Sequence, residues 1–288
     1  QEYDGSSWTT TGAYPITARG VRGSGSQTAA IGDGGDTPAP AASNVSAEYN
    51  GSTWTAGNNL PGNRIAAATS GTQTAALATT GKDNTPNPSV SNLNTSYDGT
   101  SWTAETVYPL SLRQAVSTGT SSAANLVAGG VGDAPFGDAT TKANSWDGSS
   151  WTAVGDLGTK STHGNGAGSS TASYINSGAQ DYPSYPGVTQ EYNFTSNTGI
   201  QPPGTYNANM QSWNGSSWSN RPYNLNTGTY GMMSCGTSTA ALSAGGENPA
   251  GGAAWNITEE YDGEGWTSGN TMPVARYYGG GDGTLTSA

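Results

Sequence analysis

The chain has 288 residues, a formal net charge of −11 and a sequence pI near 4.2. Such an acidic balance disfavours nonspecific binding to nucleic acid and to anionic membranes. Only 32% of the residues are hydrophobic, whereas glycine occurs 44 times and proline 15 times. This composition disfavours a helical protein, because glycine and proline are costly inside helices, and no apolar run is long enough to predict a membrane span.

One eight-residue segment recurs six times along the chain. It begins as EYDGSSWT at Glu2 and returns as EYNGSTWT, SYDGTSWT, SWDGSSWT, SWNGSSWS and EYDGEGWT. The last tryptophans of the six copies are spaced 46, 48, 49, 67 and 48 residues apart. Units of roughly 40–50 residues are typical of propeller blades and of helical repeat pairs. The composition favours the blade, which is built from short strands and turns.

Each copy predicts a hairpin with a tight turn. Asp-Gly and Asn-Gly favour such turns because both tolerate a positive φ angle. The turn places the aromatic residues that flank it opposite each other on one sheet face, where such pairs add about 0.2–1 kcal/mol. Twelve aromatic residues are therefore interpreted as structural: Tyr3, Trp8, Tyr49, Trp54, Tyr97, Trp102, Trp146, Trp151, Trp213, Trp218, Tyr261 and Trp266. The alternative is a ring of tryptophans that stack on sugars.

A second repeated segment predicts two inner strands in each unit. Examples are the Ala-, Gly- and Ser-rich stretches 18–35, 63–81 and 112–130. Small side chains suit the innermost strands of a propeller, where the taper toward the axis leaves little room. Cys235, the single cysteine, lies in such a strand and is interpreted as a buried thiol. A single histidine, His163, cannot supply a two-His or three-His metal site, so we expect no catalytic residues, no metal and no cofactor.

These residues resemble the kelch-type β-propeller repeat. Pairs of glycines end the second strand at Gly34–Gly35, Gly129–Gly130 and Gly245–Gly246, and an aromatic pair follows on the next two strands. The second and fourth units depart from the pattern, with Thr80–Gly81 and Ser177–Gly178. The units are also similar to Asp-Gly-Ser-Ser-Trp repeat proteins of bacteriophage, marine phage in particular. The resemblance implies a propeller fold and a place on a virion surface or outside the cell, and it implies little about function, since kelch propellers serve many roles.

Six hairpins predict one all-β domain over residues 1–288, a six-bladed β-propeller of four-stranded antiparallel blades. The N-terminal hairpin, residues 1–10, is expected to pair with the C-terminal strands, residues 272–288, and to close the ring. Closure removes exposed strand edges. The spacing of 67 residues predicts a long loop insertion at about 178–209 in the fourth blade.

Two groups of residues are candidates for ligand binding. Four arginines are interpreted as sharing one repeat register, at the starts of the innermost strands: Arg19, Arg64, Arg113 and Arg276. Equivalent positions in a ring converge on the axis, and arginine suits carboxylate, sulfate or phosphate groups. The alternative is hydrogen bonding between blades. The insertion adds Tyr182 and Tyr185, which suit sugar or protein recognition or, alternatively, packing on their own blade.

The predicted function is a noncatalytic binding or adhesion module on a phage virion or cell surface. Its partner would be a surface glycan or a protein receptor, recognised through the face that carries the long loops, without nucleic acid or membrane insertion. Two alternatives remain, a purely structural virion component whose loops meet neighbouring subunits and a glycan-cleaving propeller enzyme. Two aspartate pairs, Asp33 with Asp36 and Asp133 with Asp138, have oxygens that suit Ca²⁺, although their spacing favours solvated turns.

Overall fold

The computed structural model describes most of the chain. The described residues are 1–38, 41–83, 89–132, 139–178, 207–214, 216–220, 224–229, 231–237, 239–247, 253–277, 280–281 and 283–285. Every regular element among these residues is a β-strand, and none of them forms a helix long and apolar enough to cross a membrane. The all-β prediction is therefore confirmed.

Five antiparallel sheets of four strands follow one another along the chain. The first contains β3 (Arg22–Ser26), β4 (Ala29–Asp33), β7 (Ser46–Tyr49) and β8 (Trp54–Ala56). The second contains β9 (Ala68–Thr72), β10 (Ala75–Thr79), β13 (Asn94–Tyr97) and β14 (Trp102–Ala104). The third contains β15 (Val116–Ser121), β16 (Ala124–Ala128), β17 (Ala143–Trp146) and β18 (Trp151–Ala153).

The fourth and fifth sheets repeat this order, and three small hairpins complete the set. The fourth contains β19 (Asn165–Gly168), β20 (Ser173–Gly178), β21 (Asn207–Trp213) and β22 (Trp218–Asn220). The fifth contains β23 (Met233–Thr237), β24 (Ala240–Ala244), β25 (Thr258–Tyr261) and β26 (Trp266–Ser268). The hairpins pair β1 (Glu2–Tyr3) with β2 (Trp8–Thr9), β5 (Asp36–Thr37) with β6 (Ala41–Ala42), and β11 (Lys82–Asp83) with β12 (Ser89–Val90).

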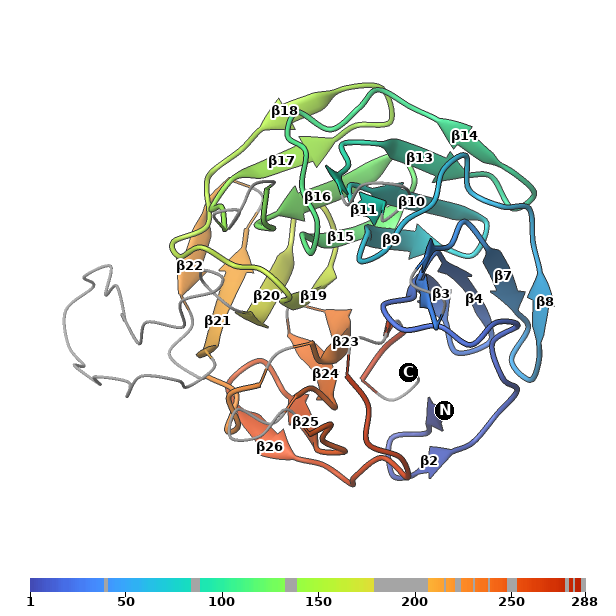
Figure 1. Ribbon diagram of the computed structural model, residues 1–288. Coiled ribbons are helices and arrows are strands. Elements are labelled where there is room, and N and C mark those ends of the chain that lie inside the picture. The colour runs from blue at the N-terminus through green and yellow to red at the C-terminus, as the bar shows by residue number, and fades with distance from the viewer. Residues whose placement is uncertain are drawn as a thin grey trace.

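The large sheets are arranged around a common axis as the blades of a β-propeller. The strands β3, β9, β15, β19 and β23 lie nearest the axis, and β8, β14, β18, β22 and β26 lie at the rim (Figure 1). Successive innermost strands from β3 to β23 contact each other in chain order. The innermost strands are built largely from Gly, Ser, Thr and Ala, so they can approach the axis closely.

The turn of each outer hairpin is held by its first side chain. The Asp4 carboxylate accepts hydrogen bonds from the backbone N–H groups of Ser6 at 2.8 Å and of Ser7 at 2.7 Å, and Gly5 between them has a φ of 90°. The same bonds form in the other copies, at Asn50, Asp98, Asp147, Asn214 and Asp262. The Asp-Gly signal in the sequence thus corresponds to a turn stabilised by side-chain to backbone hydrogen bonds.

The aromatic residues that flank each turn lie opposite each other in the backbone register. The backbone register pairs Tyr3 with Trp8, and the other five copies pair in the same way. Ring centroids of five of these pairs lie 5.0–5.1 Å apart. A second tyrosine meets Trp54 edge-on, since the centroids of Tyr14 and Trp54 are 5.2 Å apart with an interplanar angle of 77°. Tryptophan faces are therefore occupied within the protein, which favours the structural interpretation over sugar stacking.

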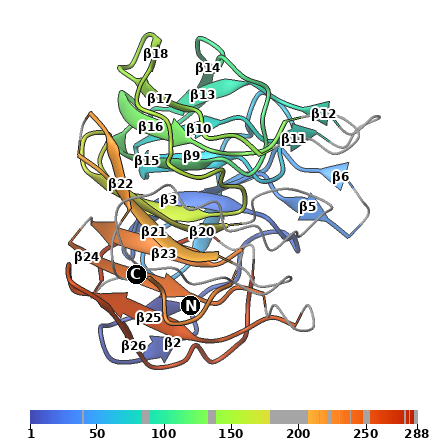
Figure 2. The same cartoon turned by 90° about the vertical axis from the view of Figure 1, so that its left-hand side faces the viewer.

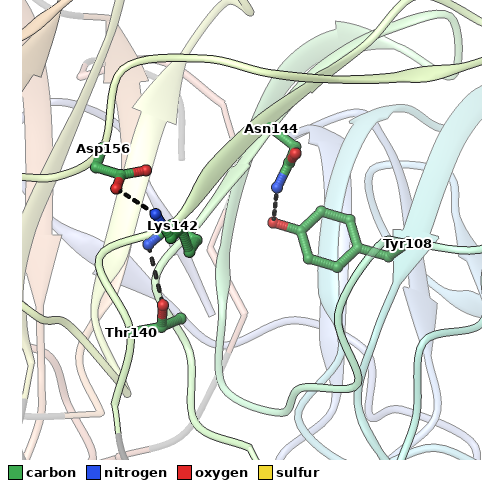
Figure 3. A network of polar contacts seen from close by, with 5 residues as sticks. All are labelled: Tyr108, Thr140, Lys142, Asn144 and Asp156. Carbon is green, nitrogen blue, oxygen red and sulfur yellow. Dashed lines mark hydrogen bonds and ion pairs between the residues drawn. The ribbon is translucent and has the colours of Figure 1, made fainter.

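The core is divided among the spaces between neighbouring sheets. One cluster joins the first two sheets and contains Ile31, Leu60, Ala76, Ala78, Tyr97 and Trp102. The segment that leads to each innermost strand also contributes a buried side chain, such as Tyr108 before the third sheet. The Tyr108 hydroxyl donates a hydrogen bond to the Val127 carbonyl at 3.3 Å and accepts one from Asn144 Nδ2 at 2.9 Å (Figure 3).

The glycine pairs mark the place where the chain crosses from one blade to the next. Gly35 donates its backbone N–H to the Arg64 carbonyl at 2.8 Å, and Gly130 donates to Ser161 at 2.7 Å. A Cβ on Gly34 would lie 2.5 Å from the Arg64 carbonyl oxygen, which is too close for any side chain. The glycines therefore allow close approach of the next segment. Thr80 takes the equivalent place in the second sheet and adopts a φ of 62°.

Candidate binding face and central channel

The two ends of the propeller carry different kinds of connections. The outer-hairpin turns meet the turns between the two inner strands, as shown by Gly51 against Thr28 and Gly99 against Thr74. These tight turns therefore share one end. The longer connections, including β5–β6 and β11–β12, project from the other side of the ring (Figure 2). We call this second end the long-loop face.

Backbone hydrogen bonds place two of the candidate arginines at equivalent positions. The Arg64 carbonyl accepts from Gly35 N, and the Arg276 carbonyl accepts from Gly246 N, both at 2.8 Å. Arg276 is exposed, whereas Arg64 has no exposed surface. The same repeat position is therefore buried in one blade and exposed to solvent in another.

The other two candidate arginines occupy the next position along the chain. Arg19 forms a bridge with Asp36, and Arg113 forms a bridge with Val131, each one residue beyond a glycine pair. The prediction of a single arginine register is therefore wrong, because Arg19 and Arg113 are offset by one residue from Arg64 and Arg276. A shift of one residue in an extended segment turns the side chain to the opposite side.

Arg19 lies at the surface of the long-loop face. Its side chain is 77% exposed and forms an ion pair with Asp36, with 2.8 Å between Arg19 Nη2 and Asp36 Oδ2. Lys142 and Asp156 form a second ion pair at the same distance, and the Lys142 backbone N–H donates to Thr140 Oγ1 at 3.1 Å (Figure 3). The Lys142–Asp156 pair is exposed on both sides and contributes little to stability, typically under about 1 kcal/mol, whereas the Asp36 side chain is only 8% exposed. Arg19, Lys142 and Asp156 leave charged groups available at the surface.

Arg64 is instead part of the interior between the first two sheets. Its Nη1 donates to the Ala78 carbonyl at 2.7 Å, and desolvation lowers its pKa to about 10. Asp33 lies nearby in β4 and accepts a hydrogen bond from Thr69 Oγ1 at 2.9 Å. Desolvation raises the pKa of Asp33 to about 6, against the opposing effects of Thr69 and of the Arg64 charge. Arg64 therefore fits the alternative of bonding between blades and does not line the channel.

A cavity of about 450 Å³ lies on the axis between the innermost strands. Its lining is almost entirely Gly, Ser, Thr and Ala, with Cys235 beside Ser234 on β23. Cys235 is buried, as predicted, and packs against Tyr3 and Leu242. The lining offers hydroxyl and backbone groups but no cluster of ionisable side chains. The channel is therefore a space of neutral character along this stretch, lined by small side chains.

Backbone hydrogen bonds link the blades just before the innermost strands begin. Gln114 N donates to the Ala66 carbonyl at 3.0 Å, and His163 N donates to the Gln114 carbonyl at 3.2 Å. Gly231 N continues the series to the His163 carbonyl at 3.3 Å. Ala66, Gln114 and His163 all have φ angles of 54–60°, as this geometry requires. His163 thus has a structural place in the backbone that the sequence did not reveal.

A set of hydroxyl–carboxylate bonds between blades also escaped the sequence interpretation. The Tyr49 hydroxyl donates to Glu2 Oε1 at 2.6 Å, and the Tyr97 hydroxyl donates to Glu48. The signal was present, since a glutamate precedes the tyrosine in three copies of the repeat. It could be recognised only once the fold placed each tyrosine beside the preceding blade.

Some candidate residues lie outside the described part of the chain. Tyr182 and Tyr185, most of the insertion at 178–209, and the pair Asp133 and Asp138 belong to this group. Asp33 and Asp36 are described, and they bond to Thr69 and Arg19 respectively. Among the described residues no group of three or more His, Cys, Asp or Glu side chains is placed to hold a metal ion.

The sequence matches no protein-family model and no curated protein. The arrangement of the sheets defines the class of the protein, a β-propeller. Propellers serve many functions, so the role of this one has to be argued from its surface and its channel.

Proposed function

We propose that this protein is a noncatalytic recognition module that binds a surface glycan or a protein receptor through its long-loop face. The observation that carries the proposal is the asymmetry of the two ends. In the part of the chain that the structure describes, the connections at one end are tight turns, whereas β5–β6 and β11–β12 project from the other end (Figure 2). Loops held on a rigid scaffold are where binding residues usually lie.

The proposal includes a sixth blade that closes the ring. The N-terminal hairpin contacts the fifth sheet as consecutive sheets contact each other. Asn270 Nδ2 donates to the Ser6 carbonyl, just as Thr106 Oγ1 donates to the Ser149 carbonyl at 3.1 Å between the second and third sheets. Trp8 Nε1 likewise donates to the Asn270 carbonyl at 3.2 Å. The same contacts at the junction support a closed ring.

The C-terminal residues supply the inner part of this sixth blade in the proposed ring. Gly280 lies against Gly23 of β3, and Gly281 lies against Ser234 of β23. Leu285 packs against the cluster that contains Tyr3 and Cys235. Segments from both ends of the chain therefore lie between the first and fifth sheets, where a sixth blade would stand.

The long-loop face has the chemistry that suits a polar partner. Arg19 is exposed and holds the buried Asp36 through Nε and Nη2, so its remaining guanidinium N–H groups would meet a carboxylate or sulfate of a ligand.

The proposed setting is a phage virion or a cell surface, outside the cytoplasm. It rests on the resemblance of the repeats to kelch units and to phage repeat proteins, together with the acidic net charge of −11, which suits a soluble exposed surface. No cofactor, nucleic acid or membrane insertion belongs to the proposal.

A glycan array combined with a size-exclusion assay tests the function. The parent protein is compared with an Arg19→Ala variant on the long-loop face and a Ser149→Ala variant on the opposite face. Binding to acidic glycans by the parent and the Ser149 variant, with a loss of at least five-fold for the Arg19 variant, supports recognition through this face. Binding that survives in the Arg19 variant but fails in the Ser149 variant contradicts it.

Two further results would point to the alternatives. Ordered self-association without glycan or receptor binding would favour a structural virion component. Release of sugar from a bound glycan would favour a glycan-cleaving enzyme.

A further inference from the structure

The axial channel narrows at the end near the long-loop face. A separate cavity of about 40 Å³ lies there, lined by Arg22, Thr69, Ser117, Asn165, Gly166 and Gly281, among others. One water occupies at least about 10–15 Å³ by this kind of measure. The space therefore fits a few waters or one small ion, and it is far too small for a sugar or a peptide.

Positive charge gathers around this narrow end. Arg22 begins β3 and lines the cavity, while Arg113 and His163 precede β15 and β19. Desolvation and the charges of Arg113 and Arg22 lower the pKa of His163 to about 3, which indicates that all three groups share one region. The His163 ring is consequently neutral at pH 7 and can donate or accept a hydrogen bond.

One described carboxylate interacts with Arg22, and one of its two oxygens is hydrogen-bonded while the other is not. Asp33 stands opposite Arg22 in the β3–β4 register, but its Oδ2 accepts from Thr69 Oγ1 at 2.9 Å, and Arg64 also acts on it. Two arginines, Arg22 and Arg64, thus act on this one carboxylate, while Arg113 and Arg22 act on His163. Among the described residues of this region positive charge is in excess, in a protein whose net charge is −11.

A buried donor at the same cavity has no acceptor in the protein. Asn165 Nδ2 is inaccessible to solvent and has no hydrogen-bond partner. Buried polar groups are nearly always paired, so an unpaired amide N–H beside a polar cavity indicates a bound species that accepts hydrogen bonds. Oxygens of an anion would satisfy this amide and would also accept from the Arg22 guanidinium, which has an interaction within the protein as well.

We propose that the narrow end of the channel binds a small inorganic oxyanion, phosphate or sulfate, between Arg22 and Asn165, with Arg113 adding positive charge. This site does not depend on the recognition role of the long-loop face. It would hold the first, third and fourth blades together through their innermost strands. The anion would therefore act as a structural ligand on the axis.

The single histidine makes the site easy to observe. The imidazole signals of His163 are followed by NMR while phosphate is added, with sodium chloride at matched ionic strength as the reference. We expect a saturable shift at millimolar phosphate in the parent. The Arg22→Gln variant should bind at least ten-fold more weakly, and Asn165→Ala should be weakened as well. The Arg19→Gln variant should behave like the parent, because Arg19 lies on the outer surface.

Two results of the NMR titration would contradict the site. One is a shift of the His163 signal that sodium chloride reproduces, and the other is a shift that does not saturate with phosphate. An Arg22→Gln variant that binds phosphate as tightly as the parent also contradicts it. If Arg22→Gln unfolds, the Asn165→Ala variant decides, because it removes only a short neutral side chain. Isothermal titration with sulfate then repeats the measurement without reliance on the histidine signal.

Discussion

The hydroxyl of Tyr3 donates a 2.6 Å hydrogen bond to the carboxylate of Glu260, which lies 257 residues away in the sequence. Burial, and then this bond, raise the pKa of Tyr3 to about 12. The same kind of hydrogen bond joins the Tyr49 hydroxyl to Glu2 and the Tyr97 hydroxyl to Glu48. A tyrosine of one blade thus reaches the glutamate of the preceding blade.

Removing a tyrosine hydroxyl that bonds to a carboxylate should destabilise the protein more than removing one that bonds to a backbone carbonyl. We expect Tyr97→Phe to lower the free energy of unfolding by about 1–2 kcal/mol, because hydrogen bonds to charged groups are the stronger kind. The matched control is Tyr261→Phe, whose hydroxyl donates to the Gly263 carbonyl within its own hairpin. Its expected cost is about 0.5–1 kcal/mol. Urea denaturation measures both, and a larger loss for Tyr261→Phe would contradict the prediction.

The strained residue Thr80 offers a stabilising substitution. It has a φ of 62° where the first, third and fifth sheets place glycine, and its buried hydroxyl has no hydrogen-bond partner. We expect Thr80→Gly to raise the free energy of unfolding by about 1 kcal/mol, because relief of strain and of the unpaired hydroxyl outweighs the added chain entropy and the lost methyl.

The reverse substitution is the control for Thr80. A Cβ at Gly129 would lie 2.4 Å from the Ser161 carbonyl oxygen. Gly129→Thr should therefore cost about 2–4 kcal/mol. Thermal denaturation measures the stability of both variants. A Thr80→Gly variant less stable than the parent would show that the Thr80 side chain stabilises the fold by more than its backbone strain destabilises it.

The buried Arg64 should control the titration of Asp33. A carboxyl whose folded-state pKa is raised favours folding below its unfolded pKa near 4, and that contribution falls as pH rises through about 6. We expect the ¹³C signal of the Asp33 carboxyl to titrate at about 6 in the parent and higher in Arg64→Met, because the charge of Arg64 lowers this pKa.

Arg64→Met should also destabilise the fold, by on the order of 3 kcal/mol, since it leaves a buried carboxyl without its cation. Arg19→Met is the comparison, and the Asp33 signal should keep the titration of the parent. An unchanged Asp33 titration in Arg64→Met would show that the two groups are not coupled.

The turn aspartates should make the protein sensitive to acid. Hydrogen bonds from the turn N–H and hydroxyl groups lower the pKa values of Asp4, Asp98, Asp147 and Asp262. A lowered folded-state pKa contributes stability above the unfolded pKa, near 4, and this contribution is lost as pH falls below it.

Replacing all four turn aspartates with asparagine tests this contribution. Asn50 and Asn214 already hold the same turn, so the fold should be kept. The fall of the unfolding free energy between about pH 5 and pH 2 should be shallower in this variant than in the parent. An equally steep fall would assign the acid sensitivity to other carboxyl groups.

The sequence predicts the repeat and the hairpins well, because both follow from local chemistry. Asp-Gly turns and the aromatic pairs depend on residues a few positions apart, and the structure has them in the predicted register. The arginine register was wrong for a different reason. Arg19 and Arg113 lie 11 residues after the last Trp of their hairpins, whereas Arg64 and Arg276 lie 10 residues after theirs, and this offset of one residue was not counted.

The environment of a repeated residue also depends on neighbours that the sequence does not identify. Arg64 is buried because the path of the chain places it over Ala78, while Arg276 at the equivalent position is exposed. Arg22 was overlooked as a candidate because the search looked for arginines repeated between units, and an arginine is the first residue of the innermost strand in the first sheet alone among those described. Its relation to Asn165 depends on sheets that meet across the axis.

Closure of the ring is the claim on which both the recognition face and the channel site depend, since both need the blades to surround one axis. A double-mutant cycle on Tyr3→Phe and Glu260→Ala tests it most directly, with Tyr97→Phe and Glu48→Ala as the reference pair between consecutive sheets. A closed ring predicts a coupling energy of about 1 kcal/mol for both pairs. Coupling in the reference pair with none between Tyr3 and Glu260 would contradict closure.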